Sequence, residues 1–222
     1  MPIFFGEENF RGMRKLKTPL SDSDVRGLNL GEIVFLSGEI FTARDLASAR
    51  ILELASSARY EEIPIERGAV IYHCGPLVKR KRKERKPAGE GEKANGSEGA
   101  AWEIISAGPT TSARMNAVMP KIIEILQVRA IIGKGGMNAA TREAMRRHGC
   151  VYLAFTGGAG VLAASKMRVL QVYWEDLGLA EAVWHLSVEN FGPLVVSIDA
   201  NGESLYEKVL EEAKKRTLMS LS

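Results

Sequence analysis

Short apolar runs alternate along the chain with longer segments in which apolar residues recur at helical spacing. The runs predict strands, and they are Ile33–Leu36, Ala69–Tyr72, Ile104–Ala107, Ala130–Ile132, Val151–Phe155, Val169–Trp174 and Leu194–Ile198. Helical spacing covers residues 42–58, 112–126, 138–147, 161–164 and a last segment that begins near 204. This repeated strand and helix order predicts an α/β domain without internal repeats.

Local signals mark where these elements begin and end. Thr42 and Asp45 approximate a capping box, which predicts a helix start with Arg44 in its first turn. His148-Gly149 is typical of a helix C-terminus, and Gly38 is expected to break the first strand. Near the end, Asn201-Gly202 predicts a turn, and the stretch Ser204-Leu-Tyr-Glu207 predicts a capping box for the last helix.

Two strand-to-helix turns carry the candidate chemistry. Gly108–Met115 contains Arg114, and Ile131–Met137 contains Lys134. In a mostly parallel sheet such turns gather at the carboxyl ends of the strands, where helix N-termini offer free amide donors. Arginine and lysine there add full positive charges, so we expect a site for an anionic small molecule. Arg44 has the same predicted setting, although its spacing alone favours an exposed helix charge or an ion pair with a nearby carboxylate.

Two further stretches leave alternatives open. The turn Gly157–Gly160 could cradle an anion or could let two backbones pack closely. His73 and Cys74 are adjacent on a predicted strand, so their side chains point to opposite faces and make poor joint metal ligands. We therefore expect ordinary packing for this pair and assign no metal ligand in the chain.

Composition limits the classes of protein that are possible. The chain has 222 residues, of which 45% are hydrophobic and 26% charged, which fits one soluble globular domain over 1–222. No apolar stretch approaches the roughly 20 residues that span a bilayer, and the first residues lack a signal-peptide pattern, so we expect a cytoplasmic protein. Cys74 and Cys150 are the only cysteines. They exclude a disulfide scaffold and are too few to hold a cuboidal iron–sulfur cluster.

A basic segment interrupts the middle of the chain. Residues 79–86 are almost all lysine and arginine, and the stretch to about 100 is nearly free of apolar residues. This composition predicts a flexible surface loop over about 79–100. The segment lacks the interleaved aromatic residues that stack on single-stranded nucleic acid, and the net charge of +3 is modest. We therefore expect neither nucleic acid nor membrane as a partner.

The sequence lacks the usual nucleotide-binding motifs, but it contains one motif found in RNA-binding proteins. The sequence contains neither G-x-G-x-x-G after the first strand nor G-x-x-x-x-G-K-[ST]. Ile131–Gly136 matches the G-x-x-G loop of KH RNA-binding domains, which would make the chain a KH-like protein. A KH loop joins two helices. The segment before Gly133 is short and rich in β-branched residues, which favours a strand rather than a helix.

Five motifs, in order, resemble one family. They are Thr42–Asp45, Gly108–Met115, Ile132–Met137, Phe155–Gly160 and Val183–Pro193. This series resembles the β subunit of class I iron–sulfur fumarate hydratases, and it is nearly as similar to the β subunit of L(+)-tartrate dehydratase. The resemblance runs from about Gly31 to the end of the chain and corresponds to the C-terminal domain of the single-chain enzymes.

The resemblance implies a fold, a reaction and a partner. The fold would be a swivelling β/β/α domain, and the reaction would be the reversible hydration of fumarate to (S)-malate, with L(+)-tartrate as the alternative substrate. A 4Fe-4S cluster would be held by three cysteines of an α subunit, so this chain would be inactive alone. Arg44, Arg114 and Lys134 would hold substrate carboxylates, and Thr110 would be the catalytic base. One position departs from the pattern: the family usually has His where this chain has Ser48.

Overall fold

The computed structural model describes residues 13–81 and 101–220, without the side chains of 218–220. Its strands are β1 (Arg14–Lys17), β2 (Ile33–Thr42), β3 (Val70–Tyr72), β4 (Leu77–Arg80), β5 (Trp102–Ser106), β6 (Ala130–Gly133), β7 (Val151–Ala154), β8 (Met167–Tyr173) and β9 (Val183–Ile198). Its α-helices are α1 (Asp22–Arg26), α2 (Asp45–Ser56), α3 (Met119–Leu126), α4 (Ala139–His148), α5 (Gly160–Ala164) and α6 (Leu205–Ser220). Short 3₁₀ turns are η2 (Tyr60–Glu62), η4 (Ser112–Met115), η5 (Gly157–Ala159) and η6 (Glu175–Leu177).

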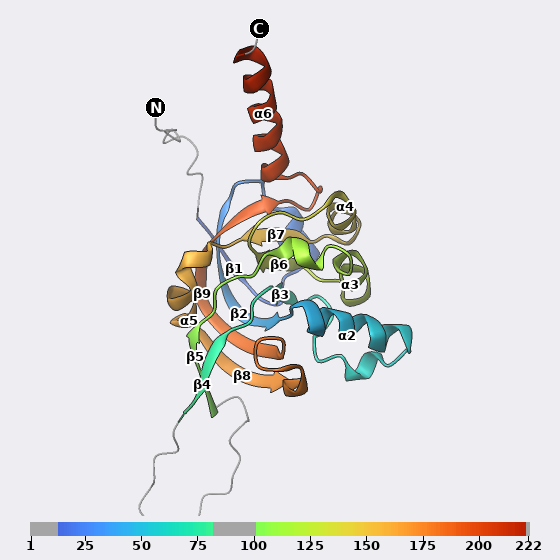
Figure 1. Cartoon of the computed structure of the whole chain (residues 1–222), viewed down its shortest axis with the longest axis vertical. Coiled ribbons are helices and arrows are strands. Elements are labelled where there is room, and N and C mark those ends of the chain that lie inside the picture. Colours follow the sequence, from blue (N-terminus) through green and yellow to red (C-terminus); the bar gives the residue numbers. More distant parts are fainter. Residues whose placement is uncertain (1–12, 82–100, 221–222) are drawn as a thin grey trace, which may run out of the picture.

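The main sheet closes on itself. Its order is β1-β2-β3-β6-β7-β9-β8, and an additional pairing of β2 with β9 joins five of the strands into a ring. The pairs β1–β2, β2–β3, β3–β6 and β6–β7 are parallel, whereas β9 runs antiparallel to its neighbours. The predicted α/β class is confirmed, with a sheet barrel and covering helices (Figure 1).

Alternation along the strands produces two cores. Successive strand residues point to opposite faces, so in β3 Val70 and Tyr72 join the core inside the barrel while Ile71 joins the outer core. The outer core lies between the barrel and helices α2, α3 and α4, which lie side by side on one flank of the sheet (Figure 1). The remaining long helix, α6, projects away from the body.

Several sequence predictions of local structure need correction. The first strand does not break at Gly38 but continues to Thr42, because Gly38 adopts φ +111° in an irregular stretch of the β2–β9 pairing. The predicted helix over 112–126 divides into η4 and α3. The predicted C-terminus of α4 is confirmed, since Gly149 has φ 65° and follows His148 directly.

Two segments that the sequence left unassigned are ordered elements. Ser21 caps α1 in a complete capping box with Asp24, and β1 adds a parallel edge to β2. The predicted flexible loop begins later than residue 79, because Lys79 and Arg80 pair with β5 as part of β4. The rest of that loop, 82–100, lies outside the described residues. Within the described part of the chain, no helix is long and apolar enough to cross a membrane.

Candidate active site

The parallel strands bring several separated segments to one edge of the barrel. Parallel strands share the direction of their carboxyl ends, so the residues that follow β2, β3, β6 and β7 meet there. Arg44 follows β2, His73 follows β3, Lys134 follows β6 and Thr156 follows β7.

Gly108–Met115 reaches this edge in a different way from the one predicted. The strand before it, β5, pairs antiparallel with β4 in a separate two-stranded sheet, and η4 rather than an α-helix follows it. The prediction that this turn follows a strand of the parallel sheet is therefore wrong, whereas Lys134 does follow the parallel strand β6.

The segment 107–115 is tied to this edge by backbone contacts. Ala107 N donates to Gly160 O at 2.9 Å, and the buried Tyr72 hydroxyl donates to Ala107 O at 2.5 Å. Thr110 N donates to His73 O at 2.7 Å. Lys134 N approaches Thr110 O at 3.4 Å, so the predicted base and the predicted lysine are joined through their backbones. These contacts fix the path of the turn without using the Thr110 side chain.

The two predicted arginines converge on one carboxylate. Arg114 Nε lies 3.2 Å from Asp45 Oδ1, and its Nη2 lies 2.8 Å from Asp45 Oδ2. Arg44 Nη2 lies 3.9 Å from the same Oδ2 and 3.2 Å from Glu181. Arg44 Nη1 also donates to Ala180 O at 3.4 Å. A carboxylate therefore already lies between both guanidinium groups, the geometry that Arg side chains use to recognise carboxylates. The alternative interpretation of Arg44, an ion pair with a nearby carboxylate, is confirmed.

Neighbouring contacts link this arginine pair to Thr110. A Cβ atom at Gly75 would lie 2.5 Å from Arg44 Nη1, and the adjacent Cys74 forms a β-bridge with Pro109. Lys134 Nζ lies 3.7 Å from the Cβ position of Gly157 at the far side of the edge. The four predicted residues thus follow one continuous edge of the barrel, with Arg44 and Arg114 around Asp45 and Thr110 beside Lys134.

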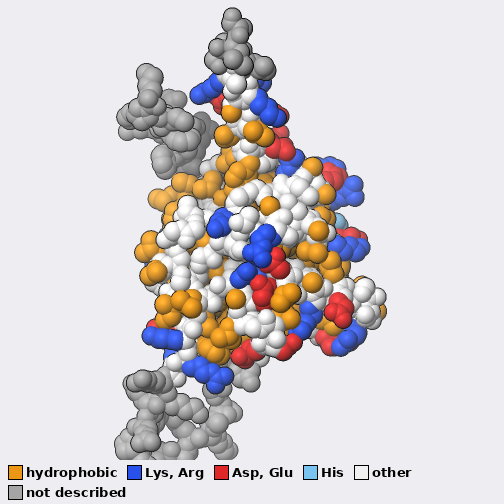
Figure 2. All heavy atoms as spheres, viewed as in Figure 1, with side chains coloured by type: hydrophobic (Ala, Val, Ile, Leu, Met, Phe, Trp, Pro, Cys, Tyr) orange, Lys and Arg blue, Asp and Glu red, His pale blue; other side chains and the backbone are white. Residues whose placement is uncertain are grey.

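Two of the predicted cations, Arg114 and Lys134, are exposed to solvent. Figure 2 shows basic and acidic side chains grouped near the middle of one face, with uncharged atoms around them. Three hollows on the surface, near Tyr60, Trp102 and Lys166, are lined by other residues, and none of them includes Arg44, Thr110, Arg114 or Lys134. Lys134 is exposed and has no ion pair within the described residues.

Asp45 is a site residue that sequence analysis placed in the wrong role. The predicted capping box fails because Thr42 is the last residue of β2 and its hydroxyl accepts from Trp184 N at 2.9 Å. Helix α2 begins at Asp45, and its N-cap is Arg44, which makes no side-chain cap bond. Arg44 is therefore not in the first helical turn. The position of Asp45 next to Arg44 was the signal available in the sequence.

Glu181 was missed entirely, and no sequence signal could have found it. It lies before β9, more than a hundred residues from Arg44, and also accepts from Leu46 N at 2.9 Å. The glycine turn after β7 was left open between two interpretations, and its last residue supports close packing. A Cβ at Gly160 would lie 2.5 Å from Ser106 Oγ and 3.0 Å from Gly108 N.

The cysteines do not fit an iron–sulfur site in this chain. Cys74 belongs to the inner core and Cys150 to the outer core, and both are buried. Burial raises the pKa of the Cys74 thiol to about 12 and also raises the pKa of Cys150, whereas cluster ligands are thiolates. Among the described residues, no group of three or more His, Cys, Asp or Glu side chains could hold a metal.

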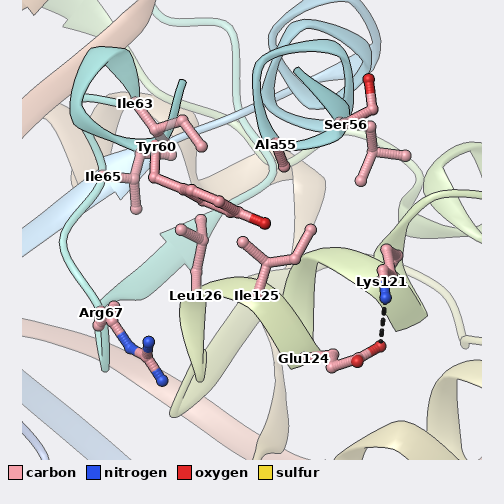
Figure 3. A pocket seen from close by; sticks show the side chains of 11 residues that line it. Ala55, Ser56, Tyr60, Ile63, Ile65, Arg67, Lys121, Glu124, Ile125 and Leu126 are labelled. Atoms are coloured by element: carbon pink, nitrogen blue, oxygen red, sulfur yellow. Dashed lines mark hydrogen bonds and ion pairs between the residues drawn. The ribbon is translucent and has the colours of Figure 1, made fainter. Parts of the chain in front are cut away.

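A larger hollow of about 710 Å³ lies between α2, η2 and α3, away from this edge (Figure 3). Its lining is mostly apolar, with the Tyr60 ring lying beside Ile125 and Leu126. The ammonium of Lys121 already neutralises the carboxylate of Glu124 at 2.9 Å. Its two cations are Arg67 and Lys121, and none of the predicted site residues lines it.

Gly133, at the end of β6, has room for no side chain. A Cβ there would lie 2.0 Å from Ser112 Oγ and 2.8 Å from the Tyr152 hydroxyl. We expect Gly133→Ala to lower the free energy of unfolding by about 1–3 kcal/mol, the usual cost of overpacking a core. Urea unfolding measures this change. Gly158→Ala is the matched control, because nothing lies within 4 Å of its Cβ position. Equal stability of the two variants would show that the space around Gly133 can accept a methyl group.

The segment Gly133–Gly136 connects β6 to α4, and this connection decides the RNA-binding alternative. A KH loop joins two helices, whereas here a strand precedes the glycines. The KH interpretation of this motif is therefore wrong.

Comparisons with known proteins place the chain in one family. The family model described as Fumarase C-terminus matches residues 8–209. The chain is 44% identical to a putative L(+)-tartrate dehydratase subunit beta of Methanocaldococcus jannaschii, over 86% of this chain and 89% of that protein. It is 34% identical to the L(+)-tartrate dehydratase subunit beta of Escherichia coli K12, over 86% of this chain and 85% of that protein.

A longer relative places the same domain within a single chain. The protein is 33% identical to a putative fumarate hydratase class I of Geobacillus stearothermophilus, over 93% of this chain but only 35% of that protein. The same unit therefore occurs both as a separate β subunit and as part of a larger polypeptide. The chain belongs to the Fumarase C-terminus family, of which it is a β-subunit member.

Proposed function

We propose that this chain is the β subunit of a two-subunit hydro-lyase that adds water reversibly across the double bond of a four-carbon dicarboxylate. The observation that carries this proposal is the convergence of Arg44 and Arg114 on the carboxylate of Asp45, at the edge that also presents Thr110 and Lys134. Two guanidinium groups that already hold one carboxylate are arranged to hold another. Lys134 supplies a further positive charge from the connection between β6 and α4, which is bonded to the backbone of the Thr110 segment.

Fumarate and (S)-malate are the first substrate pair that we propose. Arg44, Arg114 and Lys134 would hold the two carboxylates, and Thr110 would exchange the proton on the carbon next to one of them. Negative charge that develops on that carboxylate in the transition state would be stabilised by the same cations. A threonine hydroxyl ionises poorly near neutral pH, so its use as a base depends on those nearby positive charges.

L(+)-tartrate is the second candidate substrate, and a specific observation favours it. The relatives at 44% and 34% identity are both named as L(+)-tartrate dehydratase β subunits, whereas the fumarate hydratase relative is 33% identical. Both substrates present two carboxylates, so the three cations of this chain suit either of them.

An α subunit is the partner that the proposal requires. The names of the relatives as β subunits support it, and so does the exposure of Arg114 and Lys134 to solvent. We propose that the α subunit carries the 4Fe-4S cluster, because the two cysteines of this chain are buried in separate cores. In that complex we expect this domain to be the swivelling β/β/α unit, and we expect the chain to be inactive without its partner.

Reconstitution tests this function. The chain is co-expressed with its α subunit without oxygen, and fumarate hydration and L(+)-tartrate dehydration are assayed on the same preparation. We expect turnover of at least one substrate by the complex and of neither by this chain alone. The ratio of kcat/KM for the two substrates decides between them. A complex that assembles with its cluster and turns over neither dicarboxylate would overturn the proposal.

A further inference from the structure

A buried chain of polar side chains lies directly beneath the candidate site. The Tyr152 hydroxyl donates to Ser112 Oγ at 2.8 Å, and Ser112 Oγ lies 2.8 Å from His73 Nδ1. All three residues are fully buried. They come from three different elements, namely β7, η4 and the end of β3. Buried polar groups of this kind stabilise one arrangement strongly when every member is satisfied.

The direction of these hydrogen bonds follows from counting protons. Ser112 Oγ accepts from Tyr152, so its own proton needs an acceptor. Within the described residues, His73 Nδ1 is the other hydrogen-bond partner of that hydroxyl. His73 therefore accepts at Nδ1 and carries its proton on Nε2. Burial lowers the pKa of His73 to about 3, so the ring is neutral near pH 7.

At the His73 end of this row of hydrogen bonds, two buried polar atoms have no partner in the part of the chain that the structure describes. His73 Nε2 and Ser48 Oγ are both buried and have no hydrogen-bond partner among the described residues. Ala43 N donates to Tyr72 O at 3.1 Å, which brings the start of α2 beside His73. The charge of Asp45 also acts on the His73 ring, where it favours the protonated form. Within residues 13–81 and 101–220, the buried donor of His73 and the buried hydroxyl of Ser48 thus both lack a partner near the start of α2, where Asp45 also lies.

The hydrogen-bonded side chains Tyr152, Ser112 and His73 are also connected to the turn that carries Thr110 and Arg114. Ser112 N donates to Lys134 O at 3.0 Å while its hydroxyl is held from below, so both ends of Ser112 are fixed. His73 O accepts from Thr110 N at 2.7 Å. His73 therefore holds the backbone of the proposed base itself, and Ser112 holds the turn two residues further on.

We propose that Tyr152, Ser112 and His73 form a positioning unit that sets the Thr110–Arg114 turn and joins Asp45 through one ordered water molecule bound by His73 Nε2 and Ser48 Oγ. A water molecule in such a site satisfies two to four buried polar groups, which matches the atoms present. Its effect on turnover rests on the proposed function, whereas the hydrogen-bond pattern can be measured without any activity.

Nitrogen NMR of the full chain tests the hydrogen-bond pattern. The sequence has three histidines, so ¹⁵N-histidine labelling gives few signals, and His148→Gln and His185→Gln variants identify His73 by elimination. We expect His73 to be the neutral tautomer with its proton on Nε2, unchanged between pH 8 and pH 5. If His73 carries its proton on Nδ1, or if its ring titrates near pH 6.5, the proposed hydrogen-bond pattern is wrong. A crystal structure with no water at His73 Nε2 would overturn the bridge.

Kinetics of the complex with its α subunit test the positioning role. We expect Ser112→Ala to lower kcat roughly 10- to 100-fold, the effect of a small misplacement of catalytic groups. KM should change much less, and Tyr152→Phe should lower kcat by a smaller factor. Ser197→Ala is the matched control, because Ser197 is also buried and its hydroxyl contacts Tyr152 O at 3.5 Å on the other side.

The outcomes of the two experiments separate this inference from the proposed function. If the wild-type complex turns over its substrate but Ser112→Ala and Ser197→Ala lose equal activity, the positioning role is wrong and the function stands. If the wild-type complex is inactive, the function is wrong, and the NMR result still decides the hydrogen-bond unit. If Ser112→Ala does not fold, Tyr152→Phe replaces it, and an unchanged kcat in that variant would count against the role.

Discussion

Replacing Arg114 by alanine should lower kcat/KM of the assembled complex about 30- to 700-fold. We take the loss of a charge-assisted contact to a substrate carboxylate as about 2–4 kcal/mol, and about 1.4 kcal/mol corresponds to tenfold. The guanidinium already contacts the carboxylate of Asp45 through two nitrogens, so its geometry suits a planar carboxylate. Steady-state assays with the substrate found by reconstitution measure this effect.

The Arg114 side chain is about half exposed, so its removal should leave the chain folded, although Asp45 loses its nearest cation. Thermal unfolding of the variant should therefore stay cooperative, with a midpoint slightly below that of the wild type. Arg59→Ala is the matched control, because Arg59 forms an exposed ion pair with Glu62 at another part of the molecule. Arg114→Lys should recover only part of the activity, since an ammonium cannot form two parallel hydrogen bonds. Full turnover by Arg114→Ala would exclude Arg114 from substrate binding.

Replacing Thr110 by alanine should lower kcat by about 10²- to 10⁴-fold, the usual contribution of a positioned general base. The backbone of Thr110 already bonds His73 and Lys134, so the alanine variant keeps the path of the turn while it loses the hydroxyl. Substrate affinity should change little, because the cations remain. Single-turnover and steady-state kinetics on the complex separate the two effects.

Thr111 provides the matched control for this experiment. It is the next residue, it is exposed, and its backbone forms a bridge with Lys134. Thr111→Ala should keep most of the activity, and Thr110→Ser should keep more than Thr110→Ala because it retains a hydroxyl. If Thr110→Ala and Thr111→Ala are equally active, the base must be another group.

Much of the fold could be predicted because it depends on local patterns. The buried strand β6 and the helix α4 with Gly149 at its end follow from apolar runs, helical spacing and a glycine with positive φ. Strand β9 was only partly predicted, since its buried central residues are separated by exposed or half-buried ones and its pairings with three neighbours are irregular. Closure of the barrel depends on the β2–β9 pairing, which joins residues about 150 apart.

The sequence by itself determined the class of domain and the family, and it singled out Arg44, Thr110, Arg114 and Lys134 as candidates for the site. Those features can be recognised from short motifs, because the residue types in each motif are the ones that its local chemistry requires. Only the tertiary structure decided that Asp45 lies between Arg44 and Arg114, that Glu181 reaches the same arginine, and that His73 supports Ser112 from below. Such contacts join distant segments through the packing of the barrel, and no local pattern encodes the distances between them.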